Sequence, residues 1–365
     1  MDGNFYRIHN LIDVIISQNV NDLVLQQIEF QIAYFKVNKI ETKAPYCIYV
    51  LPFSEYPEND SVLYTFHLVK GIHGSVMLDR LNHIAVIKEK NGYSIYTDIP
   101  FLINLFIQFI FLEEDIALVH AAAIADKDGN IILLPGAGGV GKTTLLSVLV
   151  KDYKYKLLGD DIVGITKKGE CLAFPRSFVL KDYHRTVYPE VFQKLGIVDN
   201  NKKNIIKAKI VELIRANIPF LGFIKIVLRS LNLFDKVKNT ISVLDVPYLA
   251  AVPVEDIFGR GIVTNIGKID RIIFLERYMG TESIITPISK ESLTHRMFAI
   301  INHEFVDVMR QFFTLGALEI IDSFNYFKKI TSIISSCISE TKNELMLIPD
   351  DKSPLELNNE FLKQL

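Results

Sequence analysis

The sequence has no tryptophan and only three cysteines among its 365 residues. Cys47, Cys171 and Cys337 lie far apart, and no C-x-x-C pair is present. An odd number of widely spaced cysteines argues against a disulfide framework. A reducing cytosol is the simplest compartment for such a chain, so we expect a cytoplasmic protein.

The sequence also lacks an excess of charge of either sign. Its 40 basic and 42 acidic residues leave a formal net charge of −2. Proteins that bind nucleic acids or acidic membranes usually carry a basic surplus. We therefore expect neither a nucleic acid nor an acidic membrane as a partner.

No apolar run is long enough to cross a membrane as a helix. The most apolar one, FLINLFIQFIFL (101–112), has twelve residues and contains Asn104 and Gln108. We interpret it as a buried helix, with a helix on a membrane surface as the alternative. The first residues contain an early Asp and no long apolar core, so we expect neither a secretory signal nor a transmembrane segment.

What the chain does contain is enough apolar sequence, 49%, for a sizeable core. We find no internal repeat and no low-complexity tract. The length fits two domains or one large domain with additions. We expect an N-terminal α+β domain over 1–115, with a role in substrate recognition. An α/β nucleotide domain should follow over 116–340, with a helical insertion at about 184–240, and a tail over 341–365.

Hydrophobic periodicity predicts the individual elements. The segment 82–98 contains Asn-Gly between two β-like runs, which is typical of a tight hairpin. The other predicted strands are 44–53, 62–69, 116–126, 131–135, 155–165, 171–180, 241–246, 250–256, 261–266 and 270–278. The predicted helices are 143–152, 292–313 and 317–337, together with two helix-like segments inside the insertion.

The stretch GAGGVGKTT fits two kinds of nucleotide loop. Read as G-x-G-x-x-G, it is the turn of a dinucleotide site; read as G-x-x-x-x-G-K-[ST], it is a phosphate loop. Lys142 and Thr143 favour the second reading, because a lysine can reach the β- and γ-phosphates and a threonine hydroxyl can join Mg²⁺. The candidate nucleotide-binding residues are Gly136, Ala137, Gly138, Gly139, Val140, Gly141, Lys142, Thr143 and Thr144.

Two carboxylates follow one helix and one strand later, in LLGDD. In a regular strand Asp160 and Asp161 would point to opposite faces, but beside Gly159 at a strand end both can turn toward the nucleotide. A carboxylate there can hold Mg²⁺ or accept a proton from an attacking hydroxyl. An aspartate that merely ends the strand is the alternative. The chain has no N-K-x-D base-reading motif, which distinguishes it from a typical signalling GTPase.

In residues 118–165 a histidine before the strand, the glycine loop and the Asp-Asp pair occur in an order that resembles the HPr kinase/phosphorylase family. That family shares its nucleotide-binding core with ATP-dependent phosphoenolpyruvate carboxykinase, so the resemblance implies an α/β fold with a P-loop kinase core. It implies active-site positions for His120, Lys142 and Asp160, with Asp160 as the base, and it assigns the Thr143 hydroxyl to Mg²⁺. From its residue type and apolar surroundings alone, His120 is better explained as a core histidine.

A second stretch, VEDIFGRGIVTN (254–265), is similar to a short acidic segment with Arg and Gly that the family uses in catalysis. On this likeness Arg260 is a catalytic candidate, and Glu255 joins Asp161 as a candidate magnesium ligand. A plain glycine turn between strands is the alternative. We expect Arg176 to be solvated, with a phosphate or substrate contact as the alternative.

These residues predict an ATP- and Mg²⁺-dependent kinase that phosphorylates a hydroxyl of a protein, peptide or small molecule. A nucleotide-dependent switch or ATPase that binds a partner protein is the first alternative, and a dinucleotide oxidoreductase is the second. The family tends to form rings, which implies a homo-oligomer. The acceptor is not identified by the sequence.

Overall fold

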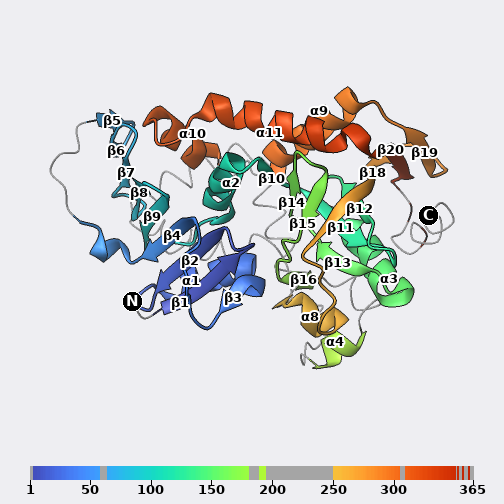
Figure 1. The fold of residues 1–365 in the computed structure, drawn as a ribbon, viewed down its shortest axis with the longest axis horizontal. Helices are drawn as coiled ribbons and strands as arrows, with labels where there is room; N and C mark the ends of the chain where they lie inside the picture. Colours follow the sequence, from blue (N-terminus) through green and yellow to red (C-terminus); the bar gives the residue numbers. More distant parts are fainter. Residues whose placement is uncertain are drawn as a thin grey trace, which may run out of the picture. The chain divides into compact units, whose positions relative to one another are not determined.

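The computed structural model shows a mixed α/β protein with two large sheets and several helices (Figure 1). The chain divides into two compact units, the first made of residues 1–177 and 253–365 and the second of residues 178–252. The structure describes residues 3–57, 64–180, 189–194, 250–304 and 309–350, and the single residues 352, 356 and 361.

The first sheet lies in the N-terminal part of the first unit. Its described strands are β1 (Gly3–Ile8), β2 (Ile12–Ser17), β3 (Lys36–Val37), β4 (Tyr46–Leu51), β5 (Tyr64–Phe66), β6 (Val69–Ile72), β7 (Val76–Asp79), β8 (Ile84–Glu89) and β9 (Gly92–Thr97). They follow the order β3-β1-β2-β4-β9-β8-β7-β6-β5. Strand β4 runs parallel to both β2 and β9. Helix α1 (Asp22–Ile32) lies in the connection between β2 and β4, and the Asn21 side chain caps it by accepting from Val24 N.

The hairpin predicted at 82–98 is confirmed, with its turn shifted by one residue. Strands β8 and β9 pair antiparallel from Ile84–Thr97 to Glu89–Gly92, so Lys90 and Asn91 form the turn. Gly92 begins β9 instead of completing the turn. A Cβ on Gly92 would lie 1.9 Å from the carbonyl oxygen of Cys47 on β4, so the close approach of these two strands requires glycine.

The apolar run at 101–112 forms the buried helix α2 (Asn104–Glu113). All its residues from Asn104 to Leu112 are buried. A helix that is apolar on every side is stable only when it is enclosed. Its polar Gln108 is used inside the protein, where Oε1 accepts from Leu118 N at 2.6 Å. None of the described helices combines the length and apolarity needed to cross a bilayer.

The second sheet forms the core around the glycine loop. Its described strands are β10 (Ile116–Val119), β11 (Ala121–Ala125), β12 (Ile131–Pro135), β13 (Lys156–Gly159), β14 (Val163–Thr166), β15 (Glu170–Leu172), β18 (Ile266–Tyr278), β19 (Ile284–Pro287) and β20 (Lys342–Pro349). The main order is β10-β14-β15-β18-β12-β11-β13, with β20 pairing to β18 and β19. Strands β12 and β20 both run parallel to the long β18. Helix α3 (Lys142–Tyr153) follows β12 and contacts β11.

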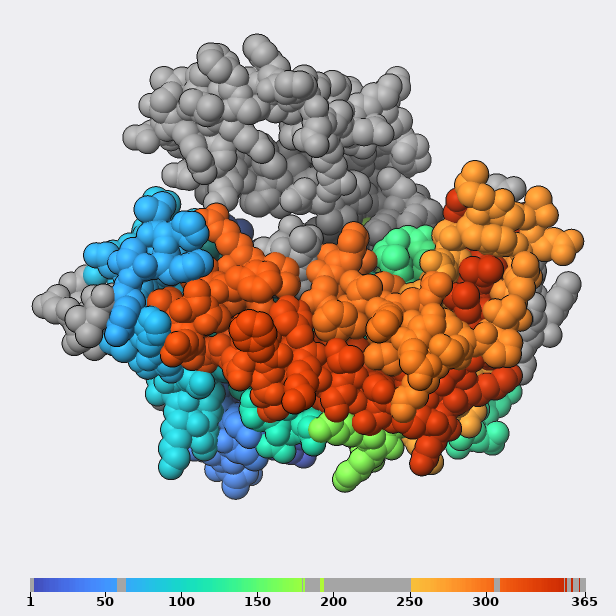
Figure 2. Space-filling view, turned by 90° about the horizontal axis from the view of Figure 1, so that it is seen from above, coloured from blue at the N-terminus to red at the C-terminus, as the bar shows by residue number. Residues whose placement is uncertain are grey.

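Three helices near the C-terminus lie on the same side of the two sheets. They are α9 (Lys290–Glu304), α10 (Met309–Ala317) and α11 (Ser323–Cys337). Figure 2 shows them in orange to red, forming one face of the first unit between the blue β5–β6 region and β19. In α11, Ile330, Ile333, Ile334 and Cys337 are buried, a spacing that places them on one helix face. That face contacts β14, while α11 also contacts α2 and α9.

The hydrophobic core does not stop at the domain boundary that the sequence suggested near residue 115. One continuous cluster contains Ile8 of the first sheet, Phe106 of α2, Leu118 of β10 and Phe312 of α10. It also contains Phe174, which lies between β15 and β16. The N-terminal segment and the core of the second sheet therefore share buried side chains. The boundary at 115 does not divide this core into two. A separate function for residues 1–115 remains a prediction.

Several sequence predictions need correction in this part of the chain. The strand predicted at 250–256 ends with β17 (Ala250–Val252), and after Pro253 the chain forms helix α8 (Val254–Phe258). Of the strand predicted at 261–266, the bridge between Val263 and Leu157 remains, and Ile266 is the first residue of β18. The tail was predicted to begin at 341, but Lys342–Pro349 forms β20.

The second unit is described only in part. Strand β16 (Phe178–Leu180) pairs antiparallel with β17, and α4 covers Pro189–Lys194. The two helical segments predicted within 184–240 and the strand predicted at 241–246 lie outside the described residues.

The remaining helical predictions are confirmed with shifted ends. The helix predicted at 292–313 corresponds to α9 and α10, and the one at 317–337 begins only at Ser323, where the Asp322 side chain caps α11. Short 3₁₀ turns cover Ala33–Phe35, Phe53–Glu55 and Ile338–Glu340.

Candidate functional site

The glycine loop joins β12 to α3, which is the strand–loop–helix context that the sequence predicted. Gly139 and Gly141 have φ values of 80° and 110°, a region that side-chain-bearing residues rarely adopt. Residues 137–139 are exposed, whereas Val140 and Thr144 are buried and hold the loop against the core. The first backbone N–H groups of a helix attract anions, and the loop leads directly into α3.

Lys142, the first residue of α3, is buried with 6% of its surface exposed. Its Nζ donates to the carbonyl oxygens of Gly136 at 2.6 Å and Ala137 at 2.9 Å. It also lies 3.1 Å from Nε2 of His120. The loop thus curls around its own lysine, and the ammonium group is held inside the curve.

His120 lies at the junction between β10 and β11, where the strand predicted at 116–126 is divided. It is 7% exposed, and its Nδ1 lies 3.4 Å from Oδ1 of Asp161. Burial lowers the pKa of His120, and Lys142 lowers it further, against the opposing charge of Asp161. An ammonium group can only donate, so Nε2 accepts from Lys142 and the ring proton of the neutral imidazole is assigned to Nδ1, facing Asp161. His120 therefore links the lysine to the second aspartate.

Asp160 and Asp161 divide the strand predicted at 155–165 and lie between β13 and β14. They face different partners around the same loop. Oδ2 of Asp160 accepts from the Thr143 hydroxyl at 3.1 Å. Oδ2 of Asp161 accepts from Arg176 at 2.6 Å. Asp160 therefore turns toward the start of α3, whereas Asp161 turns toward His120 and Arg176.

The Asp160 carboxyl group is the most perturbed acid of the site. Its Oδ1 is buried without a hydrogen-bond partner, although the residue as a whole is partly exposed. Burial, followed by the charge of Asp161, raises the pKa of Asp160 to about 7, while Thr143, Lys142 and Arg176 oppose the rise. A carboxyl group with a pKa near neutrality can accept and release a proton under physiological conditions. The free Oδ1 is an acceptor directed into this enclosed position.

These oxygens also bear on whether Mg²⁺ fits the site. In the described residues no group of three or more His, Cys, Asp or Glu side chains is arranged to hold a metal. Mg²⁺ usually needs only one or two protein oxygens, because phosphate oxygens and water complete its shell. The Thr143 hydroxyl and Oδ2 of Asp160, which lie 3.1 Å apart, fit that requirement. Oδ1 of Asp160 has no hydrogen-bond partner and is a further oxygen that could contribute. Asp161 is a weaker candidate, since its oxygens already face His120 and Arg176.

Arg176 is more closely integrated than the solvated side chain that the sequence suggested. Besides pairing with Asp161, its guanidinium group lies 4.8 Å from the ring centre of Phe30 at the end of α1. Arginine stacks well on aromatic faces. Ser177 N also donates to Phe30 O at 3.2 Å. The N-terminal segment therefore positions a cation of the site, which no local sequence pattern revealed.

Glu304, the last residue of α9, also reaches the loop and was not predicted. Its Oε1 accepts from the backbone N–H of Gly138 at 3.1 Å and lies 4.0 Å from Nε2 of His120. A carboxylate thus lies at a backbone donor of the exposed loop. The contact with Gly138 spans 166 positions of sequence, so no spacing rule predicts it.

The structure does not bring Glu255 and Arg260 to these residues through any described hydrogen bond or ion pair. Oε1 of Glu255 in α8 accepts from Gly261 N at 3.3 Å, a contact within its own turn. Its charge contributes, after burial, to a raised pKa of Tyr34. Arg260 is exposed. Their assignments to magnesium and to catalysis remain predictions from the sequence.

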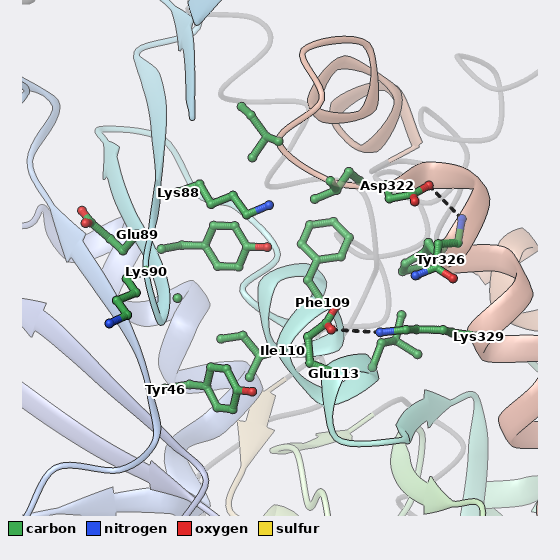
Figure 3. Close-up of a pocket in the computed structure, with 16 residues that line it drawn as sticks. Tyr46, Lys88, Glu89, Lys90, Phe109, Ile110, Glu113, Asp322, Tyr326 and Lys329 are labelled. Carbon is green, nitrogen blue, oxygen red and sulfur yellow. Dashed lines mark hydrogen bonds and ion pairs between the residues drawn. The ribbon is translucent and has the colours of Figure 1, made fainter. Parts of the chain in front are cut away.

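A cavity of 320 Å³ lies elsewhere in the first unit (Figure 3). Its lining comes mainly from β4, β8, β9, α2 and the start of α11, and includes none of the glycine-loop residues, Asp160 or Asp161. Lys329 and Glu113 form an ion pair of 2.9 Å at its edge, while Phe109 and Tyr326 contribute aromatic surface. The chemical groups of the candidate site are therefore not in this cavity but at the solvent-exposed loop.

Comparison with known proteins gives a distant structural likeness. No protein-family model and no curated protein matches the chain. Among solved structures, the chain is similar to the Hpr(Ser) kinase/phosphatase from Coxiella burnetii, with 12% identity and a TM-score of 0.27. That match covers 68% of this chain and 97% of the other. A likeness of this extent assigns no role to any residue.

Proposed function

We propose that the protein is an ATP-dependent kinase of the HPr-kinase-like type, which transfers the γ-phosphoryl group to a hydroxyl of a protein, peptide or small molecule. One observation carries the proposal: Asp160, with a pKa raised to about 7, lies beside Thr143 at the start of the helix that follows a glycine loop. A nucleotide switch has no need for a proton acceptor at this place.

The loop would hold the phosphates through its backbone N–H groups and the N-terminus of α3. Lys142 already lies inside the curve of the loop, and its carbonyl partners can be exchanged for phosphate oxygens. Charge grows on the oxygens of the transferred group, so a fixed ammonium group there stabilises the transition state. His120 also contacts that ammonium group through Nε2.

Asp160 would accept the proton of the acceptor hydroxyl through Oδ1, the oxygen without a partner. Asp161 would hold His120 and Arg176 in position through its two carboxylate oxygens. Mg²⁺, when bound by the Thr143 hydroxyl with the help of Asp160, supplies charge neutralisation at the phosphate oxygens. The base role of Asp160 and the magnesium role of Thr143 follow the sequence prediction. The help of Asp160 with Mg²⁺ is added to it, and a positioning role replaces the predicted magnesium role of Asp161.

The test is phosphoryl transfer from radiolabelled ATP to candidate acceptors, including a cell extract, a Ser/Thr peptide library and free serine. We expect labelled products whose masses have each gained one phosphoryl group. Tight ATP binding without any labelled acceptor would instead favour a nucleotide-dependent switch that binds a partner protein.

The choice of nucleotide can be tested without knowing the acceptor. ATP with Mg²⁺ should stabilise the protein against heat by about 2.7 kcal/mol at 100 times its dissociation constant, because only the folded state binds it. NAD⁺ at the same concentration should leave the melting temperature unchanged. Stabilisation by NAD⁺ and not by ATP, measured by differential scanning fluorimetry, would restore the dinucleotide interpretation of the loop.

A further inference from the structure

The Glu304 carboxylate lies where a phosphate ligand of the loop would be expected to bind. Oε1 accepts from Gly138 N at 3.1 Å, and Gly138 is one of the exposed residues of the loop. A backbone N–H in such a loop is a donor for anions. Carboxylate and phosphate oxygens are both acceptors, so they compete for the same donor.

The surroundings of Glu304 favour an exchangeable contact over a permanent one. The Glu304 side chain is 30% exposed, so it can turn into solvent without a change in the backbone of α9. The positive neighbour Lys142 is held by the carbonyl oxygens of Gly136 and Ala137 and contacts His120. His120 lies 4.0 Å away, and its pKa is lowered by burial, so it offers little charge to retain the carboxylate.

We propose that Glu304 is an intramolecular competitor for the anion position at Gly138, which every phosphate ligand of the loop must displace. The inference rests on the proposed function, since it assumes that the loop binds phosphates. A competitor tied to the same chain is always at high local concentration. The Glu304 carboxylate would lower the affinity for ATP, ADP and pyrophosphate by the same factor. A nucleotide, which makes many contacts, still binds after this loss, whereas a single anion that binds weakly does not.

The experiment measures binding of ATP, ADP and pyrophosphate by calorimetry in EDTA, for the wild type, Glu304→Gln and Glu304→Ala. Glutamine keeps an acceptor oxygen but loses the charge, and a charged hydrogen bond is roughly twice as strong as a neutral one. We expect all three ligands to bind about fivefold more tightly to Glu304→Gln, and more tightly still to Glu304→Ala. Glu291→Gln is the matched control, because Glu291 is an exposed acid in the first turn of the same helix. It should bind like the wild type.

Salt separates direct competition from general repulsion between negative charges. Repulsion across solvent is screened within about 3 Å at 1 M ionic strength, whereas displacement from a hydrogen bond persists. The gain in affinity should therefore remain in 1 M KCl. A gain that disappears in salt, or a Glu304→Gln protein that binds no more tightly than the wild type, overturns the inference.

The same titrations are repeated with Mg²⁺ in place of EDTA to test a role of Glu304 in metal binding. Variants that change affinity only with Mg²⁺ would also overturn the inference. Failure of the phosphate loop itself is distinguishable from both, because none of the proteins, including the wild type, would then bind any polyphosphate. Failure of the kinase proposal alone would leave these affinities unchanged and would appear only as missing phosphoryl transfer. Thermal melting of the ligand-free variants checks that each is folded.

Discussion

Lys142→Ala should reduce phosphoryl transfer by about 10³-fold or more, the largest effect expected from a single substitution in this protein. The change removes the Lys142 ammonium group from inside the curve of the loop, where charge would develop on the phosphate oxygens during transfer. Transfer from radiolabelled ATP in single-turnover experiments measures the loss. Lys151→Ala is the matched control, because Lys151 is an exposed lysine in the last turn of the same helix.

The lysine is buried, so its removal must be separated from a loss of folding. The variant should retain a cooperative thermal transition, because Gly136 and Ala137 remain close to the exposed part of the loop, where water can replace the ammonium group. A folded Lys142→Ala protein with wild-type turnover would contradict the assignment of a phosphate loop.

Asp160→Asn should lower kcat by roughly 10²–10⁴-fold, because an amide keeps the shape of the side chain but cannot accept the proton. Binding of ATP with Mg²⁺ should weaken much less than kcat falls, because the amide still offers one oxygen beside the Thr143 hydroxyl. Asp161→Asn is the comparison variant: it keeps an oxygen for Arg176 or His120 but loses the charge that holds both, so we expect a smaller loss of kcat. Single-turnover phosphorylation with a magnesium titration measures both variants.

The pH dependence gives a second readout of Asp160. Below about pH 7 the carboxyl group is mostly protonated and cannot act as a base, so kcat/KM of the wild type should rise with pH through about 7 and then level off. The residual activity of Asp160→Asn should lack this rise. If both variants change only the magnesium requirement and neither slows transfer at saturating Mg²⁺, the base lies elsewhere and a nucleotide switch becomes the better interpretation.

The raised pKa of Asp160 also affects folding stability, which should fall as pH rises, whereas activity should increase. The pKa of Asp160 is raised above the ordinary value of 3.8, so folding favours its protonated form. The resulting stabilisation is complete below the unfolded pKa and is lost as pH rises through about 7. The ligand-free wild type should therefore melt at a lower temperature at pH 8 than at pH 6, with a smaller difference in Asp160→Asn.

The sequence by itself determined the features that depend on neighbours along the chain. Glycine spacing and a following apolar periodicity predicted the loop between β12 and α3, and an Asn-Gly pair predicted the hairpin of β8 and β9. The run 101–112 predicted a buried helix because it is strongly apolar but too short to cross a membrane. Each of these follows from backbone preferences and burial within about twenty residues, so distant partners change little.

Other elements were missed because a tertiary partner reversed the local signal. Strand β20 buries Glu344 together with Met346 and Ile348 on one face. A glutamate on the inner face obscures the alternating pattern of a strand. Glu344 is paired there with Lys342, at 2.9 Å, and with Arg271 of β18, at 2.5 Å, and the second ion pair joins positions 73 residues apart.

The tertiary structure alone decided which groups surround the loop. The adjacent aspartates were visible in the sequence, but their division of labour, with Asp160 at Thr143 and Asp161 at His120 and Arg176, depends on how the chain bends between β13 and β14. Phe30 reaches Arg176 and Glu304 reaches Gly138 through packing across the whole first unit. Hydrogen bonds and ion pairs act over a few ångströms of space and are indifferent to separation along the chain, which is why spacing predicted the loop but not the side chains that surround it.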